Sequence, residues 1–452
     1  MKTIFITILE GVESKNILRT GVVDRILSNN QSVKVVLFVK NKERAEYYQK
    51  EFHHPRISYE VAELYEPNRL NKFFGMRKFH FLRTETTKLR ATIVAEDRGR
   101  LYYHYALTLH WILARKFFVR VFRFLDLTLV TDNYFDKYFE KYKPDLILLA
   151  DLFEDFETNF LRSAKKYKVF SIGLINSWDR VTARCILRIL PDKFVVFNDV
   201  IKKEIVDTNY IDDKDIFVSG IPQYDMYFKP PTVTKEEFFK KTNISLDEKL
   251  IVYSPLGGKF SDSDWDIMDM LYQMNSENKF GDRVKILVRF PPNDFVKDED
   301  LVKRPHLIYQ YPGVRFSNKR NTDWDMTNVE LEDLKNTLHY MSLMICYASS
   351  ISVDSALVDK PVMNINFEVK ENVGLSKSPT IFYDMTHYKK VLDTGGIRLV
   401  NNKEELMDWV NKYLINQNLD HEGRLKLIST QAQFTDGLSG ERLARFVNDN
   451  LR

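Results

Sequence analysis

The chain has 452 residues, of which 44% are hydrophobic and 29% are charged. This composition excludes a disordered chain, and the length predicts two domains rather than one. Lysine and arginine number 67 against 63 acidic residues, a balance that gives no electrostatic basis for nucleic-acid binding.

The first element is a short apolar run at residues 3–9, which we predict to be a buried strand. Glu10 and Glu13 follow it almost at once and no small-residue cleavage site is present, so it does not resemble a signal peptide. No run of about 18 apolar residues occurs, and no transmembrane helix is expected. We therefore expect a cytoplasmic protein, with the inner face of the membrane as an alternative location.

Short apolar segments alternate with helical patterns along the first half of the chain. Continuous apolar strands separated by helices indicate a parallel sheet covered on both faces. The predicted strands are 3–9, 33–39, 145–150, 168–174 and 193–197, and helices are predicted at 16–29 and 155–166.

The same alternation restarts after Pro230 and Pro231. Strands are predicted at 250–254, 284–290, 306–309, 343–347, 361–366 and 397–400, with helices near 233–242, 263–275, 329–340, 350–358 and 403–416. The fold class is therefore α/β, with two Rossmann-like domains whose parallel sheets face each other across a cleft. The expected divisions are 1–228, with a helical insertion at about 69–143, then 229–435, and a C-terminal helix in 436–452 that packs back toward the joint.

The insertion contains an aromatic and basic segment at 111–129. Within it, Lys116, Arg120 and Arg123 share one helical face, while Phe117 and Phe124 point elsewhere. One interpretation is a core helix with a solvated basic edge. The other is a helix that contacts a membrane surface or a lipid-linked acceptor.

Acidic residues follow the predicted strands of the first domain, where ligands bind in open α/β sheets. Glu10 and Glu13 follow the first strand, and Asp179 follows the strand at 168–174. A carboxylate in this position suits general-base catalysis on an acceptor hydroxyl. Alternatively, the two glutamates only favour the start of their helix through its dipole.

The strands of the second domain end in residues that suit a diphosphate. Ser254, Gly257, Gly258 and Lys259 follow one strand, and Arg289 lies at the end of the next. Backbone amides, a lysine and an arginine are phosphate ligands. The glycines do not form a Walker motif, so P-loop chemistry is disfavoured.

Ser349 and Ser350 stand where the strand at 343–347 gives way to a helix. A helix N-terminus has unpaired N–H groups and the positive end of a dipole, and it binds phosphate well. Asp354 on the same helix is a candidate contact for a ribose or a base. The alternative is that the serines only cap the helix.

Metal and redox chemistry have no motif in this sequence. The nine histidines show no metal-ligand spacing, and no His-Glu-x-x-His or Cys-x-x-Cys occurs. Cys185 and Cys346 are far apart in apolar contexts, which favours two buried thiols. No metal site and no cofactor are expected.

The second half of the chain resembles the donor half of the CDP-glycerol glycerophosphotransferase-like and capsule glycosyltransferases, GT-B enzymes of bacterial surface polysaccharide synthesis. The resemblance covers about 175–445. The matching segments include Asn176–Asp179, Val218–Asp225, Ile251–Pro255, Ser342–Cys346, Ser349-Ser350, Lys360-Pro361 and Asp436–Arg442.

This resemblance implies a metal-independent transferase that moves a sugar or a polyol phosphate from a nucleotide-activated donor to an acceptor hydroxyl. It implies a nucleotide-sugar donor and a glycan or lipid-linked acceptor as partners. The family often has His-Pro where this chain reads Phe290-Pro291, and Arg289 is the residue that could replace that histidine's positive charge. An epimerase of the same architecture and a binding protein without activity are the alternatives.

Overall fold

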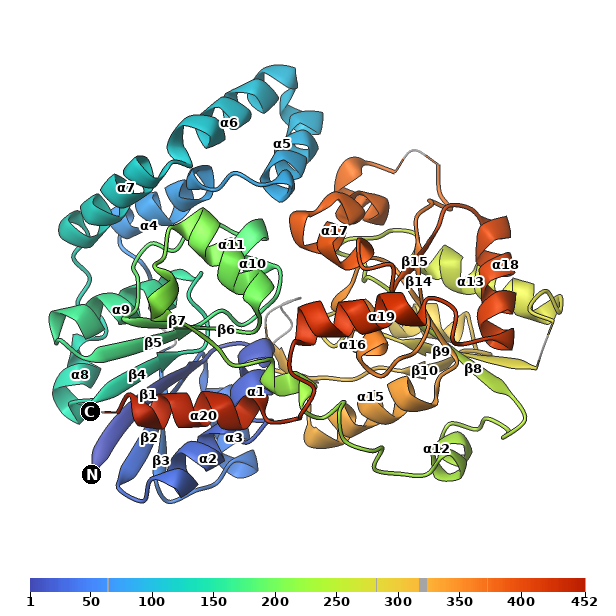
Figure 1. The fold of residues 1–452 in the computed structure, drawn as a ribbon, viewed down its shortest axis with the longest axis horizontal. Coiled ribbons are helices and arrows are strands. Elements are labelled where there is room, and N and C mark those ends of the chain that lie inside the picture. The colour runs from blue at the N-terminus through green and yellow to red at the C-terminus, as the bar shows by residue number, and fades with distance from the viewer. Residues whose placement is uncertain (63–64, 282, 317–322, 372, 452) are drawn as a thin grey trace. The chain divides into compact units, whose positions relative to one another are not determined.

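The computed structural model describes residues 1–62, 65–281, 283–316, 323–371 and 373–451 (Figure 1). The chain divides into two compact units. Unit 1 comprises Met1–Asp225 and Gln433–Arg452, and unit 2 comprises Met226–Ala432. Each unit contains one large parallel sheet, in agreement with the α/β fold that the sequence predicts.

Unit 1 contains a seven-stranded sheet in the order β3-β2-β1-β4-β5-β6-β7, and all neighbours are parallel. Its central strands are buried on both faces, which explains their continuous apolar sequences. The strands are β1 (Lys2–Ile8), β2 (Val33–Val39), β3 (Ile57–Val61), β4 (Leu146–Leu149), β5 (Phe170–Leu174), β6 (Lys193–Val196) and β7 (Ile216–Val218).

The helices of unit 1 connect these strands, and four of them form the insertion between β3 and β4. The connecting helices are α1 (Gly11–Ile17), α2 (Val22–Asn29), α3 (Lys42–Glu51), α8 (Asp136–Tyr142), α9 (Asp155–Lys166), α10 (Arg180–Ala183) and α11 (Asp199–Asn209). The insertion contains α4 (Arg69–Arg77), α5 (Glu85–Arg98), α6 (Arg100–Leu113) and α7 (Lys116–Leu129).

Two sequence predictions for unit 1 are wrong in detail. The predicted helix at 16–29 is two helices, because Gly21 between them has a left-handed φ of 69°. The solvated basic edge, one of the two interpretations of α7, fits the exposed Lys116 and Arg120 but not Arg123, which donates hydrogen bonds of 2.8 Å to the carbonyls of Leu187 and Asn209.

Unit 2 contains a six-stranded parallel sheet in the order β10-β9-β8-β13-β14-β15. Its core joins strand residues such as Ile251 and Ile345 to Leu271 and Val410 on the covering helices. The strands are β8 (Lys249–Ser254), β9 (Val284–Arg289), β10 (Ile308–Gln310), β13 (Leu343–Cys346), β14 (Val362–Ile365) and β15 (Arg398–Val400), and β11 (Val314–Arg315) pairs with β12 (Trp324–Asp325) apart from the sheet.

The helices of unit 2 alternate with these strands. They are α12 (Lys235–Lys241), α13 (Asp264–Ser276), α14 (Asp298–Val302), α15 (Asn328–Tyr340), α16 (Ser350–Leu357), α17 (Thr386–Leu392), α18 (Lys403–Ile415) and α19 (His421–Leu427). Cys185 and Cys346 are both buried free thiols.

Both sheets reverse their strand order beside the first strand of the unit. In unit 1 the reversal lies between β1 and β4, and in unit 2 it lies between β8 and β13. Connections leave these neighbouring strands toward opposite faces, and the resulting crevice at the carboxyl ends is where α/β sheets bind ligands. The residues that follow these four strands are therefore the candidates for ligand binding.

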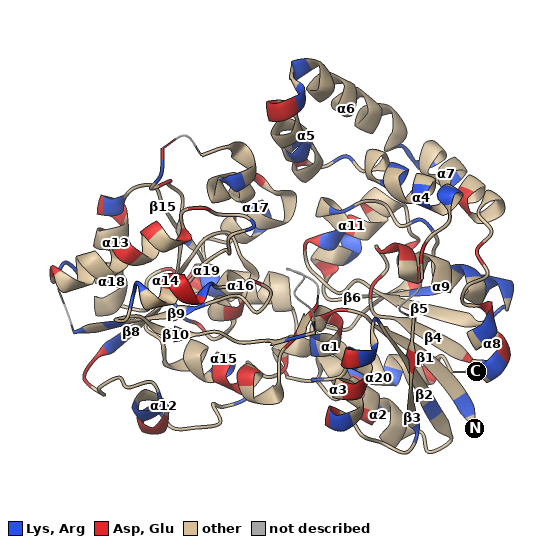
Figure 2. Ribbon diagram, turned by 180° about the vertical axis from the view of Figure 1, so that it is seen from behind, with Lys and Arg blue, Asp and Glu red and all other residues tan. Residues whose placement is uncertain are grey.

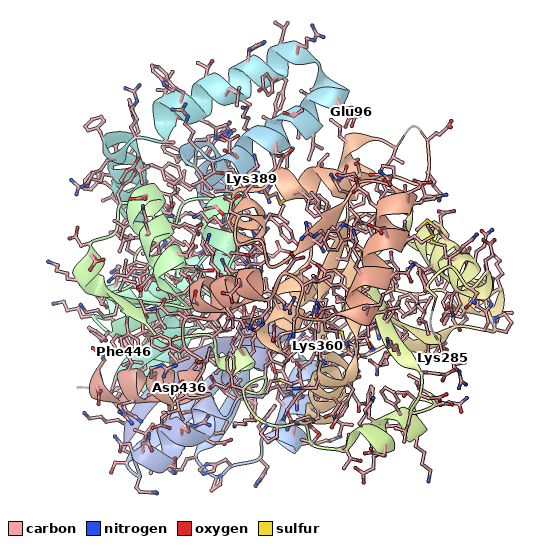
Figure 3. All side chains as sticks on the ribbon, turned by 45° about the vertical axis from the view of Figure 1, so that its right-hand side comes forward. Glu96, Lys285, Lys360, Lys389, Asp436 and Phe446 are labelled. Carbon is pink, nitrogen blue, oxygen red and sulfur yellow. The ribbon has the colours of Figure 1, made fainter. Side chains whose placement is uncertain are left out.

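The C-terminal helix α20 (Ser439–Asp449) returns to unit 1 and packs on α2. Asp225 accepts hydrogen bonds from the backbone N–H groups of Ser439 and Gly440 at 2.9 and 2.8 Å. Further along the helix, the rings of Phe446 and Phe217 are stacked with their centroids 4.2 Å apart. Figure 3 labels Phe446 on this helix. A carboxylate at a helix N-terminus satisfies unpaired donors and opposes the dipole.

We predict that Asp225→Ala lowers the free energy of unfolding by about 1–3 kcal/mol, because it leaves two buried N–H groups without their acceptor. Asp225→Asn, which keeps one acceptor oxygen, should lose less. Urea unfolding measures both values. A midpoint for Asp225→Ala equal to that of the wild type would contradict the assignment of Asp225 as the cap of α20.

Candidate functional site

Carboxylates gather at the carboxyl edge of the unit 1 sheet, where β1 and β4 diverge. Glu10 follows β1 directly, and Asp151 and Glu154 follow β4. Arg180, at the start of α10, lies among all three. Residues far apart in sequence meet here because the ends of parallel strands lie at one edge of the sheet.

The Arg180 guanidinium forms ion pairs with all three carboxylates. Its Nη1 lies 3.0 Å from an Asp151 oxygen and 3.4 Å from a Glu154 oxygen, and its Nη2 lies 3.6 Å from Glu10. Burial alone would lower the pKa of Arg180, but the surrounding carboxylates outweigh it and raise that pKa. The positive charge is therefore fixed at this edge of the sheet.

Glu10 has the properties of a general base. Burial raises the pKa of its carboxyl group, and Arg180 opposes that rise. About a quarter of its side chain remains exposed, so a hydroxyl group can reach it. A carboxylate with a raised pKa accepts a proton more readily than an ordinary surface carboxylate.

Glu13 lies deeper and has a different environment. Its Oε2 accepts hydrogen bonds from the backbone N–H groups of Leu9 and Glu10, an arrangement that completes a capping box at the start of α1. Burial and the neighbouring carboxylates raise its pKa well above the usual range. This contact fits the structural alternative for Glu13 rather than a role as the base.

Glu157 on α9 is a buried acid that the sequence analysis did not single out. Its side chain is 1% exposed, and neither carboxyl oxygen has a hydrogen-bond partner among the described residues. Burial raises its pKa well above the usual range, and Glu13 and Asp151 raise it further. The raised pKa favours the neutral form of Glu157, and the helical sequence pattern around this residue does not indicate such an environment.

Asp179 lies at the N-terminus of α10, beside Arg180. The Ser177 hydroxyl donates a 2.5 Å hydrogen bond to its Oδ1. The side chain is half-buried, and its charge contributes to the raised pKa of Arg180. Asp179 thus belongs to the same charged cluster as Glu10, on its outer side.

In unit 2, Ser349 and Ser350 lie at the N-terminus of α16, after β13. Ser349 makes no capping hydrogen bond from its side chain, and Ser350 is exposed. The hydroxyl oxygens of Tyr383 and Tyr388 accept hydrogen bonds from the backbone N–H groups of Ala348 and Ser349, respectively. The structure therefore gives no support to the alternative in which Ser349 serves only as a cap.

Arg289 lies at the end of β9 and is buried. Its Nη1 donates to Gln310, while Nη2 has no hydrogen-bond partner among the described residues. Burial lowers its pKa to about 10, and the nearby acids, Asp354 included, act in the opposite direction. The Ser254 hydroxyl donates to the Arg289 carbonyl at 3.2 Å, which links the ends of β8 and β9.

The backbone N–H groups of the glycine loop after β8 already donate hydrogen bonds to carboxylates. The N–H of Gly257 donates to Asp264 at 2.8 Å, and that of Gly258 donates to Asp294 at 3.2 Å. Lys259 is exposed, with its Nζ 5.1 Å from the ring centroid of Phe260. A phosphate at these amides would face two acids, so the geometry favours the serines and Arg289 as the phosphate contacts.

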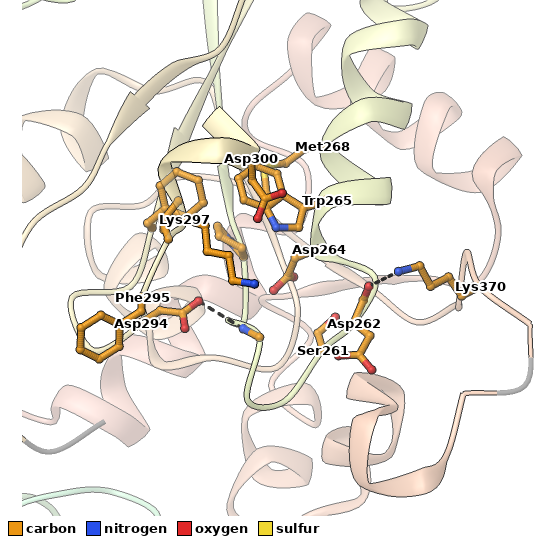
Figure 4. A pocket seen from close by; sticks show the side chains of 14 residues that line it. Ser261, Asp262, Asp264, Trp265, Met268, Asp294, Phe295, Lys297, Asp300 and Lys370 are labelled. Carbon is orange, nitrogen blue, oxygen red and sulfur yellow. Dashed lines mark hydrogen bonds between the residues drawn. The ribbon is translucent and has the colours of Figure 1, made fainter. Parts of the chain in front are cut away.

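The same loop borders a pocket of about 440 Å³ that sequence reasoning missed (Figure 4). Trp265 and Phe290 form an aromatic wall, and Lys297 and Lys370 also line the pocket. Burial raises the pKa of Asp264, which lines the pocket too, to about 6. Its size and aromatic lining suit a planar ring such as a nucleobase.

Among the described residues, no group of three or more histidine, cysteine, aspartate or glutamate side chains is arranged to hold a metal ion. The positive charge near the candidate phosphate contacts comes instead from Arg289 and the α16 N-terminus. The absence of a metal requirement stays a prediction.

Comparison with known proteins shows the family of this chain. The model of the family described as CDP-Glycerol:Poly(glycerophosphate) glycerophosphotransferase matches residues 182–449, which is more than half of the chain. No curated protein sequence matches the chain.

Solved structures with the same fold include several enzymes of nucleotide-activated substrates. The S. aureus MnaA–UDP structure matches with a TM-score of 0.53 at 12% identity, over 98% of this chain and 94% of that one. The wall teichoic acid polymerase TagF with CDPG matches with a TM-score of 0.52 at 11% identity, over 100% of this chain and 88% of that one. The UDP-GlcNAc 2-epimerase from Neisseria meningitidis bound to UDP-GlcNAc matches with a TM-score of 0.55 at 10% identity, over 98% of each chain. These similarities show a shared GT-B type fold.

The raised pKa of Glu157 predicts a pH-dependent stability. A carboxyl whose pKa is higher in the folded state than in the unfolded state, where it is about 4.3, stabilises the fold fully only below the unfolded value. That contribution is lost as the pH rises through the folded-state pKa. Glu157→Gln should therefore unfold at a higher temperature than the wild type at neutral pH, with the gap closing toward pH 4.

Thermal unfolding followed from pH 4 to pH 8 measures this difference. Glu46→Gln, on the exposed surface of α3, is the control and should not change the pH profile. If Glu157→Gln and the wild type lose stability in parallel across this range, Glu157 is ionised in the folded protein and the assignment is wrong.

Proposed function

Because the chain belongs to the CDP-glycerol:poly(glycerophosphate) glycerophosphotransferase family, we propose that it transfers a polyol phosphate or a sugar from a nucleotide-activated donor to an acceptor hydroxyl. The observation that carries the proposal is the family match at residues 182–449, which includes Arg289 and the α16 N-terminus. We expect the reaction to take place in the cytoplasm.

The donor is assigned to unit 2. The hydroxyls of Ser349 and Ser350, with the first-turn amides of α16, would bind the diphosphate. Arg289 would add a positive charge behind them, beside Phe290, the position at which the family often has a histidine. The aromatic pocket beside Trp265 would accept the base, and the buried Asp354 would lie toward the ribose.

The acceptor is assigned to unit 1. Glu10 would remove the proton from the acceptor hydroxyl as its oxygen attacks the donor. Arg180 would hold the Glu10 carboxylate in place and oppose the rise in its pKa that burial causes. We expect no metal ion to be required, because Arg289 and the helix dipole would stabilise the leaving phosphate.

The two donor classes differ in the bond that breaks. Attack on the phosphorus of a CDP-linked polyol breaks the phosphoanhydride and releases CMP. Attack on the anomeric carbon of a nucleoside diphosphate sugar breaks the bond from that carbon to oxygen and releases the nucleoside diphosphate. The family match favours the first reaction.

We predict that the purified protein releases CMP from CDP-glycerol only when an acceptor with free hydroxyls is present, and that EDTA does not change the rate. Chromatography of the nucleotide products measures this release. Release of UDP from a UDP-sugar with an acceptor would identify a glycosyltransferase instead. Conversion of the sugar without an acceptor would identify an epimerase, and no turnover of any nucleotide donor would favour a binding protein.

Glu10→Gln should lower kcat by about 10²–10⁴-fold, the usual contribution of a general base, while the donor still binds. Asp179→Asn tests the rival carboxylate and should retain activity within about tenfold, because Asp179 would act on Arg180 rather than on the acceptor. Steady-state kinetics and donor titration by calorimetry separate the two effects. A large loss in Asp179→Asn with an active Glu10→Gln would reverse the assignment.

A further inference from the structure

The turn between β13 and α16 is held by two buried tyrosines from a later part of the chain. Tyr383 lies in the 3₁₀ helix Pro379–Asp384 and Tyr388 lies in α17, and their side chains are 6% and 2% exposed. Their hydroxyl oxygens accept hydrogen bonds from the backbone N–H groups of Ala348 and Ser349. The tyrosines therefore hold the two amides that directly precede the first residue of α16.

Each tyrosine also connects this turn to the neighbouring strand. Tyr383 donates its hydroxyl proton to the Ile365 carbonyl at 2.7 Å, and Tyr388 donates to Oδ1 of Asn364 at 2.6 Å. Ile365 and Asn364 are the last two residues of β14, which pairs with β13. Because each hydroxyl accepts one hydrogen bond and donates another, the turn is fixed relative to the sheet from two points.

The hydrogen bonds continue beneath the first turn of α16. The Nδ2 group of Asn364 lies 3.1 Å from Oγ of Ser352 and 3.3 Å from the carbonyl oxygen of Tyr347. Oγ of Ser352 lies 2.9 Å from the hydroxyl oxygen of Tyr388, and both Asn364 and Ser352 are fully buried. A buried polar network whose members are paired favours a single geometry. We call this set the hydroxyl network: Ser352, Asn364, Tyr383 and Tyr388.

The hydroxyl network holds its amides without a negative charge. Elsewhere in the chain carboxylates accept from comparable N–H groups, as Asp225 does at α20 and Asp264 does at the glycine loop. A carboxylate in front of α16 would repel a phosphate, whereas burial raises the pKa of both tyrosine hydroxyls and keeps them neutral. Asp354 is the one charged residue within α16, whose other positions are drawn tan in Figure 2.

We propose that Tyr383 and Tyr388 are positioning residues of the donor site. Through their hydroxyls they would hold the turn so that the first-turn amides of α16 and the hydroxyls of Ser349 and Ser350 face the phosphates of the donor. The first amides of a helix have no partner within the helix, and Ser349 makes no capping bond from its side chain. This inference rests on the proposed function, which assigns the phosphates to α16. Neither tyrosine would contact the donor.

Tyr388→Phe tests the proposal, because it keeps the buried ring and leaves the Ser349 amide without its acceptor. The dissociation constant for CDP should rise about tenfold, the value of one hydrogen bond at the upper end of the usual range. Binding of cytidine, which has no phosphate, should equal that of the wild type. Tyr383→Phe should act in the same direction. Calorimetry measures CDP binding, ligand-observed NMR measures cytidine binding, and thermal unfolding confirms that each variant is folded.

Tyr272→Phe is the matched control. The hydroxyl of Tyr272, on α13, also donates to a backbone carbonyl, that of Ile286 at 2.7 Å, and accepts from the backbone N–H of Ile308 at 3.3 Å. It joins β9 to β10 at the opposite edge of the sheet from α17, and its loss should leave CDP binding unchanged. If the wild type binds UDP more tightly than CDP, UDP and uridine replace CDP and cytidine in every titration.

Ser349→Asp separates this inference from the proposed function. Aspartate is as good an N-cap as serine, so the variant should stay folded, while its charge should weaken CDP binding at least about tenfold. If Ser349→Asp loses CDP binding but both phenylalanine variants keep it, the tyrosines do not position the site and the donor site stands. If none of the three variants changes CDP binding, the phosphates bind elsewhere and both proposals fail. Equal losses of CDP and cytidine binding in Tyr388→Phe would show a general distortion and overturn the positioning role.

Discussion

The charged cluster of unit 1 depends on one buried cation, Arg180. Four carboxylates around it, those of Glu10, Asp151, Glu154 and Asp179, would repel one another at the edge of the sheet without it. The guanidinium lowers the pKa of the partly exposed Glu10, whereas burial and neighbouring carboxylates raise the pKa values of Glu13 and Glu157 well above the usual range. The ion-pair network thus gives Glu10 a different environment from that of the two buried acids.

Unit 2 uses the opposite charge at the equivalent position of its sheet. Both units place their polar residues where the strand order reverses, between β1 and β4 in one and between β8 and β13 in the other. In unit 2 the α16 N-terminus follows β13 at that position, and Arg289 lies at the end of β9, the other neighbour of β8. The same topology therefore presents carboxylates in one unit and a helix N-terminus in the other, and the proposed transfer uses both.

The strands were the part of the structure most open to prediction, because a parallel sheet buried on both faces requires uninterrupted apolar runs. The strand at 33–39 and the helix at 155–166 have the predicted bounds. The edge strand β3 was missed because its side chains are half-buried or exposed and mix polar with apolar residues. Strand β7 has three residues, too few for a pattern.

Site residues were predictable where they follow a strand directly, as Glu10 and Ser349 do. The roles of Arg180, Asp151 and Glu157 depend on which strands are neighbours, and spacing along the chain does not contain that information. The orientation of α7 was also hidden, because periodicity shows two faces but not which one packs inward. The side to which Arg123 points depends on its hydrogen bonds to carbonyl groups that lie 64 and 86 residues away in the sequence.

The most direct test of the assigned donor site is a crystal structure of the protein soaked with CDP-glycerol. Density for the diphosphate should lie against Ser349, Ser350 and the first turn of α16, on the side of Arg289. A nucleotide bound at the amides of Gly257 and Gly258, or held by unit 1 with the α16 N-terminus in solvent, would contradict the assignment of the donor site.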